Sequence, residues 1–210
     1  MLRRRLLVKT MCNLRVILIG GSSHVGKSTL AQRLAEQLGW HCISTDSLAR
    51  HPGRPWSAKA EFREHVAEHY LSLSVEELME DVLRHYKGMQ PNIQSLVSAH
   101  ATDDSTAPLI LEGSALWPEF ISVLKVDNTA AIWLTASNRL FETRIHNASR
   151  IGSATPAEKK AIQKFLARTL RYNEQMMEVV NQLGLMSVDV ESTASDDLAN
   201  TCLQLLKKQL

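Results

Sequence analysis

The chain alternates between short apolar runs and longer stretches in which apolar residues recur with helical spacing. Each run is bounded by small or polar residues and lacks polar alternation, which is typical of parallel strands that helices cover on both faces. The five runs are Arg15–Ile19, His41–Ser44, Leu109–Leu111, Ala130–Leu134 and Met186–Val190. They predict a parallel β-sheet.

Helices are predicted between and after these strands, at Ser28–Leu38, Lys59–Leu71, Val75–Tyr86, Asn138–Asn147, Pro156–Leu183 and Asp196–Leu210. Gly39 is placed to end the first helix, and Ser74 with Glu77 forms a capping box at the start of the third. Strands that alternate with helices predict a three-layer α/β fold with right-handed crossovers.

The strands are unevenly spaced along the chain. A largely helical insertion is expected between the second and third strands, at about residues 50–107. Within it, Ser98–Pro108 is polar enough to predict a flexible loop. A second helical excursion lies between the fourth and fifth strands. The length of 210 residues favours a single domain that carries these two additions.

Charge and cysteine content argue against a nucleic-acid-binding, membrane or disulfide-bonded protein. The chain has 24 Lys and Arg against 22 Asp and Glu, a balance too near neutral to indicate a nucleic-acid or membrane partner. No apolar stretch approaches the ~20 residues that span a bilayer. The three cysteines are far apart, so we expect reduced thiols in a cytoplasmic protein. We expect the chain to act as a monomer or homodimer. The basic opening Arg3–Arg5 is expected to fray, and Met11 is a second candidate start.

The strongest chemical signal is the pattern G-x-x-x-x-G-K-S, which follows the first strand and opens the first helix. Glycines at Gly21 and Gly26 let successive backbone N–H groups point at phosphate oxygens. Lys27 then supplies a charge for the β- and γ-phosphates, and the hydroxyl of Ser28 is a direct ligand for Mg²⁺. The predicted nucleotide-binding residues are Gly21, Ser22, Ser23, His24, Val25, Gly26, Lys27, Ser28 and Thr29. The sequence therefore predicts that the chain binds a nucleoside triphosphate with magnesium.

Two carboxylates are placed where parallel strands end, which is where open α/β sheets bind ligands. Asp46 follows the second strand, and it could accept a proton from a substrate hydroxyl or hold a water on magnesium. Its alternative role is to cap a helix that begins near Ser47. Glu112 ends the third strand beside Gly113, and it could orient magnesium's waters or the substrate. The alternative for Glu112 is a simple turn.

Arginines are the third candidate element. Arg144 and Arg168 are the first choices for guanidinium groups that close over the transferred phosphoryl group, although either could be an ordinary solvated helix charge. The segment Thr45–Trp56 contains two prolines and carries Arg50 and Arg54. These two arginines could bind a phosphate or carboxylate of the substrate, or belong to a plain surface loop.

With these residues in place, the chain resembles the small-molecule kinases of the P-loop class. The nearest resemblance is to the 2-phosphoglycerate kinase-like group, on Gly20-Gly-Ser-Ser-His-Val-Gly-Lys-Ser-Thr and Ile43-Ser-Thr-Asp-Ser. Arg139-Leu-Phe-Glu-Thr-Arg144 and Arg168-Thr-Leu-Arg-Tyr172 resemble the entrance and exit helices of the lid in nucleoside monophosphate kinases. The resemblance implies five parallel strands in the order 2-3-1-4-5, a substrate-binding helical insertion, and a lid at about residues 139–172.

The sequence also departs from those kinases. Glu112 stands where many relatives have Asp, and Ser114 follows Gly113 in place of the Pro-Arg of adenylate kinases, which argues against a nucleoside monophosphate acceptor. We therefore expect transfer of the γ-phosphoryl group of ATP to a small hydroxyl compound, such as a phosphoglycerate-like or other anionic metabolite. The rival interpretation is an NTPase or nucleotide switch that acts through a protein partner. A phosphotransferase that acts on a macromolecule is a third.

Overall fold

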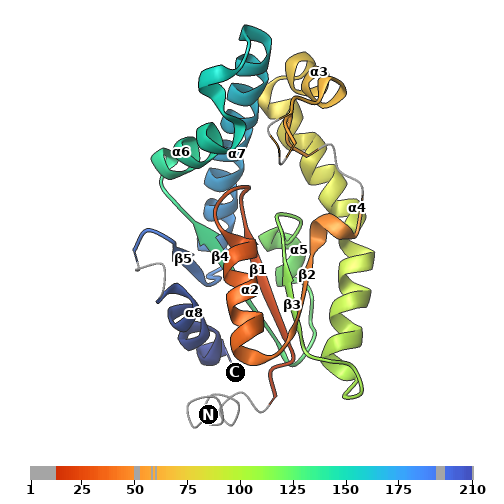
Figure 1. The fold of residues 1–210 in the computed structure, drawn as a ribbon. Helices are drawn as coiled ribbons and strands as arrows, with labels where there is room; N and C mark the ends of the chain where they lie inside the picture. The colour runs from red at the N-terminus through yellow and green to blue at the C-terminus, as the bar shows by residue number, and fades with distance from the viewer. Residues whose placement is uncertain (1–12, 50–52, 58, 60, 193–196, 210) are drawn as a thin grey trace.

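The computed structural model describes residues 13–49, 53–57, 59, 61–192 and 197–209. Its centre is a five-stranded parallel sheet in the order β2-β3-β1-β4-β5 (Figure 1). The strands are β1 (Val16–Gly21), β2 (His41–Ser44), β3 (Leu109–Glu112), β4 (Thr129–Thr135) and β5 (Ser187–Asp189). The five predicted strands and the order 2-3-1-4-5 are thus confirmed.

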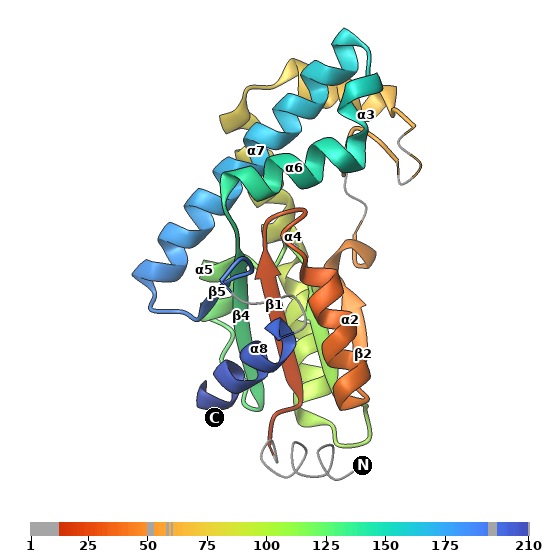
Figure 2. The same cartoon turned by 60° about the vertical axis from the view of Figure 1, so that its left-hand side comes forward.

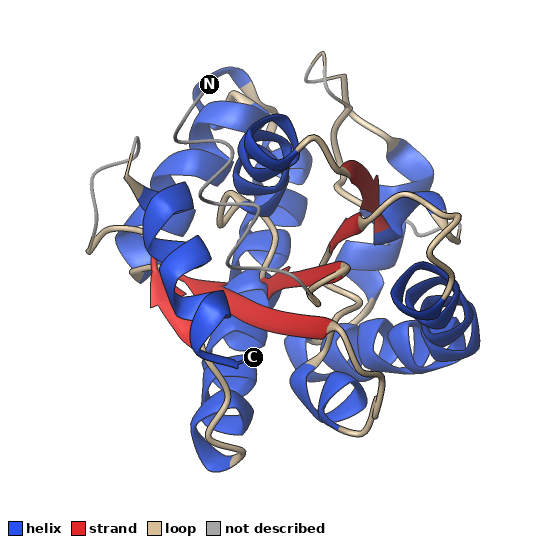
Figure 3. Ribbon diagram, turned by 90° about the horizontal axis from the view of Figure 1, so that it is seen from below, coloured by secondary structure: helices blue, strands red, loops and turns tan. Residues whose placement is uncertain are grey.

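Helices cover both faces of the sheet, as Figure 3 shows. They are α2 (Lys27–Leu38), α3 (Glu64–Ser72), α4 (Val75–Thr102), α5 (Pro118–Ser122), α6 (Asn138–Ser149), α7 (Pro156–Gln182) and α8 (Leu198–Leu206), with short 3-10 turns at Thr45–Ser47, Ile151–Ser153 and Lys207–Gln209. Alternate residues of β1 face opposite layers. Ile17 and Ile19 pack with α2 and α8, whereas Val16 and Leu18 pack with α4 and α7. The predicted three-layer α/β architecture is therefore confirmed.

Helix α4 is the largest correction to the sequence prediction. It was expected to end at Tyr86 but continues to Thr102, through Gly88 and Pro91. Its apolar face continues as well, because Met89, Ile93, Val97 and Ala101 are buried against the sheet. That packing outweighs the poor helix propensity of glycine and proline. The predicted flexible loop at Ser98–Pro108 is consequently wrong for its first five residues.

The start of α3 is the second correction. A helix was expected from Lys59, but α3 begins at Glu64. A short antiparallel bridge pairs Trp56 with Phe62, and Ser57 N–H donates to the carbonyl of Glu61. These contacts hold the preceding residues in a turn rather than a helix. The arginine cluster Arg3–Arg5, Met11 and Arg50 lie outside the described residues.

A third apolar cluster lies away from the sheet. It joins the segment between β2 and β3 to helices α6 and α7, which connect β4 to β5. Its buried members include Trp56, Tyr70 and Phe165, and Trp56 and Phe165 lie edge to face with ring centroids 5.0 Å apart. Both views place α3, α6 and the first turns of α7 together beyond the carboxyl ends of the strands (Figures 1 and 2). In the part of the chain that the structure describes, no helix is long and apolar enough to cross a membrane.

Candidate functional site

The phosphate loop connects the end of β1 to the first turn of α2. Gly26 is the residue before the helix and has a φ of 110°, a left-handed conformation that favours glycine. The side chain of Ser22 is buried and donates to the carbonyl of Thr169 in α7, 2.8 Å away. Ser22 thus attaches the loop to α7. Gly21 lies at the end of β1, and the other seven predicted loop residues, Ser23, His24, Val25, Gly26, Lys27, Ser28 and Thr29, line a cavity.

Lys27 lies inside the loop, where it is only 8% exposed. Its Nζ donates to the carbonyl of Ser22 at 2.9 Å and to Ser114 Oγ at 3.2 Å. No carboxylate in the described part of the chain lies within ion-pair distance of it. Burial lowers the pKa of Lys27, while Glu112 and Asp46 act in the opposite direction from further away. A buried ammonium held only by neutral oxygens is well placed to receive an anion.

Ser114 is a site residue that sequence reasoning missed. Its Oγ donates to the carbonyl of Gly21 at 2.9 Å as well as accepting from Lys27, and its carbonyl accepts from the hydroxyl of Tyr172 at 2.5 Å. Ser114 therefore ties the end of β3, the phosphate loop and α7 together. Its position directly after Glu112 and Gly113 was the only available signal.

Glu112 and Ser28 meet at the carboxyl edge of the sheet. Ser28 Oγ donates to Glu112 Oε1 at 3.0 Å, and the Glu112 side chain is buried. Gly113, the next residue, packs directly against the turn after β2: a Cβ added at Gly113 would lie 1.7 Å from Thr45 Oγ1. Hard oxygen ligands of this kind, together with phosphate oxygens and water, suit Mg²⁺.

Asp46 lies in the 3-10 turn after β2, with an exposed side chain that lines the same cavity. The helix-capping role considered for it is not observed. Ser44 is the cap of that turn instead, and its Oγ accepts from the backbone N–H of Asp46 at 3.3 Å. The carboxylate of Asp46 is thus available to the cavity.

The two candidate arginines occupy different places. Arg144 Nη1, from α6, donates to the carbonyls of His24 at 3.0 Å and Val25 at 2.8 Å, so it holds the backbone of the loop. Arg168, from α7, is only 5% exposed, and its guanidinium lies over the rings of Phe165 and Tyr70 at 5.0 and 5.8 Å. Its Nε has no hydrogen-bond partner among the described residues.

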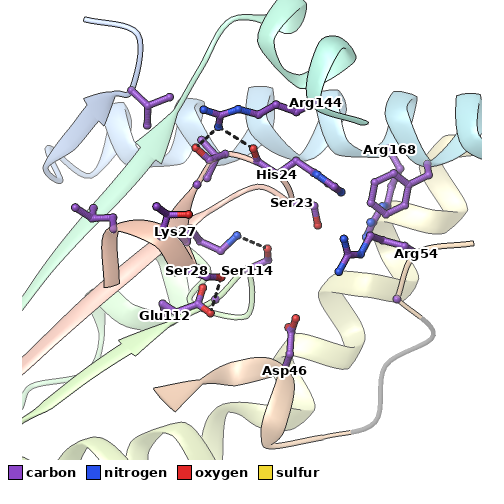
Figure 4. Close-up of a pocket in the computed structure, with 18 of the residues that line it drawn as sticks. Ser23, His24, Lys27, Ser28, Asp46, Arg54, Glu112, Ser114, Arg144 and Arg168 are labelled. Atoms are coloured by element: carbon purple, nitrogen blue, oxygen red, sulfur yellow. Dashed lines mark hydrogen bonds between the residues drawn. The ribbon is translucent and has the colours of Figure 1, made fainter. Parts of the chain in front are cut away.

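A single cavity of about 760 Å³ joins these groups. Figure 4 shows Asp46, Arg54 and Arg168 around the space opposite Lys27 and Ser28. The cavity wall is completed on one side by Val190, Leu198 and Ala199 near α8, and on the other by Trp56, Arg63, Tyr86 and Phe165. The structure thus brings together every described candidate residue except Gly21 and Ser22, which support the loop from behind.

Comparison of the sequence with family models and with curated proteins gives no match. Among solved structures, the chain is similar to a gluconokinase from Sinorhizobium meliloti 1021, with a TM-score of 0.56 and 19% identity over 94% of each chain. It is also similar to shikimate kinase from Acinetobacter baumannii in complex with shikimate, with a TM-score of 0.51 and 15% identity over 96% of this chain and 97% of that one. Shikimate kinase from Aquifex aeolicus vf5 gives a TM-score of 0.51 and 14% identity over 92% and 97%. At these identities the likeness establishes the fold: the chain has the three-layer α/β P-loop fold found in these kinases.

Proposed function

We propose that this chain is a small-molecule kinase that transfers the γ-phosphoryl group of MgATP to a hydroxyl of an anionic acceptor. The observation that carries the proposal is a pair of buried cations in one cavity. Neither Lys27 nor Arg168 has a carboxylate within ion-pair distance among the described residues, and an exposed carboxylate, Asp46, lines the same space. Burial of unpaired cations is costly, so the cavity favours anionic ligands at both positions.

The phosphate loop holds the triphosphate in this proposal. Backbone N–H groups at the N-terminus of α2 face the phosphates, and Lys27 exchanges its contact with the Ser22 carbonyl for phosphate oxygens. Ser28 would ligate Mg²⁺ directly, and Glu112 and Asp46 would hold it through water. Magnesium, when bound, neutralises charge on the β- and γ-phosphates. Arg144 keeps the loop carbonyls turned away from the phosphates.

Asp46 is the proposed general base. The hydroxyl of the substrate that receives the phosphoryl group attacks the γ-phosphorus, the bond from that phosphorus to the bridging oxygen of ADP breaks, and the hydroxyl proton passes to Asp46. The products are ADP and the phosphorylated acceptor. The guanidiniums of Arg54 and Arg168 lie where they can hold the acceptor's anionic group. Positioning and charge stabilisation thus supply the catalysis.

The test is ADP release from MgATP with and without a panel of acceptors. The panel contains the phosphoglycerates and D-glycerate, together with gluconate and shikimate, because gluconokinase and shikimate kinase share the fold. Glycerol is the uncharged member. Turnover that depends on one anionic acceptor supports the proposal, and ³¹P NMR then identifies the product.

Matched variants separate the site from the rest of the protein. Lys27→Ala and Asp46→Asn should abolish the acceptor-dependent turnover, whereas Lys125→Ala and Asp127→Asn, at exposed positions outside the cavity, should not. Equal turnover with every acceptor and with none would contradict the kinase and favour the NTPase that acts through a protein partner.

A further inference from the structure

His24 has an unfavourable backbone conformation within the phosphate loop. Its φ of 66° lies in the left-handed region, where a histidine is less stable than a glycine. The conformation is held in part by Arg144, which donates to the His24 carbonyl. A residue that keeps a side chain at such a position is a candidate for a functional role, because glycine there would relieve the strain.

The ring of His24 points toward the acceptor half of the cavity. It lies 6.0 Å, centroid to centroid, from both Trp56 and Phe165, which belong to the third apolar cluster. Figure 4 shows the imidazole directed toward Arg54 and Arg168, away from the carbonyl that Arg144 holds.

The imidazole also has an unused hydrogen-bonding group. Its Nε2 is buried and has no partner among the described residues, which is costly in an apolar setting. Burial first, and then the charges of Arg54, Lys27 and Arg144, lower the pKa of His24 to about 4. The ring is thus uncharged at neutral pH, with one N–H donor and one acceptor nitrogen.

We propose that His24 is a specificity-determining residue of the acceptor subsite, where its imidazole nitrogen binds the carboxylate or phosphate of the acceptor beside Arg54 and Arg168. A hydrogen bond between the ligand and Nε2 would offset the cost of the unpaired nitrogen. Calling the bound anion an acceptor rests on the proposed function. The binding of an anion at His24 does not itself require phosphoryl transfer.

The test uses three probes with the same three-carbon skeleton: D-glycerate, glycerol 3-phosphate and glycerol. Each is titrated into the ¹⁵N-histidine-labelled protein with saturating MgADP, and the ring signals of His24 are assigned by their loss in His24→Phe. We expect D-glycerate or glycerol 3-phosphate, but not glycerol, to shift the His24 nitrogens. The arm that responds tells a carboxylate acceptor from a phosphorylated one.

The variant His24→Phe keeps an aromatic ring against Trp56 and Phe165 but lacks the nitrogens. It should weaken binding of the responding anion about tenfold, and the loss of MgADP affinity should be smaller than that. His24→Gly, which relieves the backbone strain, should give the same loss and secures the result should the Phe variant fold poorly. His65→Phe, at an exposed position on α3, is the control and should leave both affinities unchanged.

Three results would overturn the inference: no shift with either anion, equal anion affinity in wild type and both His24 variants, or a larger loss of MgADP affinity than of anion affinity. Failure here is distinguishable from failure of the proposed kinase activity. If an anion shifts the His24 signals but no turnover is found, the anion-binding subsite is supported and the proposed phosphoryl transfer is contradicted. If turnover is the same in wild type and His24→Phe, the kinase activity is supported and the role of His24 in the acceptor subsite is contradicted.

Discussion

Ser28 Oγ and Glu112 Oε1 are joined by a 3.0 Å hydrogen bond across 84 residues of sequence. The contact exists because β3 is inserted beside β1, with Glu112 in register with Ile19 two residues before the phosphate loop. A serine that opens a helix and a glutamate that ends a strand are thereby fixed at one point. Both groups offer oxygen to a divalent cation at that point.

Glu112→Gln should raise the magnesium requirement of the proposed kinase reaction. The amide can still accept from Ser28, but it lacks the charge that holds the metal's water shell, so we expect about a tenfold higher Mg²⁺ concentration for half-maximal turnover. A magnesium titration at fixed ATP measures this. Glu119→Gln, at an exposed position on α5, is the control. An unchanged magnesium titration would show that Glu112 does not contribute to magnesium binding.

Lys27→Met should lower the turnover of the protein without lowering its free energy of unfolding. Turnover is expected to fall at least about 100-fold, because the charge that faces the transferred phosphoryl group is lost. The free energy of unfolding should not fall, since the buried ammonium has no carboxylate partner among the described residues. Urea unfolding monitored by circular dichroism makes the comparison. A large loss of stability would show that Lys27 is mainly structural.

Arg144→Met should weaken nucleotide binding. The variant frees the carbonyls of His24 and Val25 and lets the loop relax, so we expect about a tenfold weaker affinity for MgADP by calorimetry. Arg139→Met, at an exposed position earlier on the same helix, should bind MgADP like the wild type. Equal affinities for the two variants would contradict the role of Arg144.

Gly113→Ala should destabilise the fold by ~3 kcal/mol, because the added Cβ would overlap Thr45. Gly152→Ala provides the control, since a Cβ there meets no atom within 4 Å. Denaturant unfolding of both variants measures the difference. Equal stabilities would mean that the turn after β2 moves aside at little cost.

His24 should make stability depend on pH in the acid range. Its pKa falls from the ordinary 6.5 to about 4 on folding, so the unfolded chain binds more protons between these two values. Stability should therefore be complete above pH 6.5 and decrease as the pH falls toward 4, by up to about 3 kcal/mol from this residue. His24→Asn, which tolerates the left-handed conformation, should flatten that part of the profile. Identical profiles would show that His24 titrates normally.

Much of the scaffold could be predicted because its signals are local. Apolar runs marked all five strands, and the Gly26-Lys27-Ser28 motif marked the junction of strand and helix. The continuation of α4 past Pro91 depends on burial against distant strands, which no local pattern records. The different places of Arg144 and Arg168 could not be predicted either, because both are arginines on helices after β4 and only their packing partners separate them.

The third apolar cluster packs together the two chain segments that flank the cavity. Trp56 comes from the segment between β2 and β3, and Phe165 from the segment between β4 and β5, yet their rings pack at 5.0 Å. Close-packed groups of this kind transmit displacement rather than absorb it. We therefore expect the two segments to move as one body. The factor by which bound nucleotide changes the affinity for the acceptor must then equal the factor by which bound acceptor changes the affinity for nucleotide.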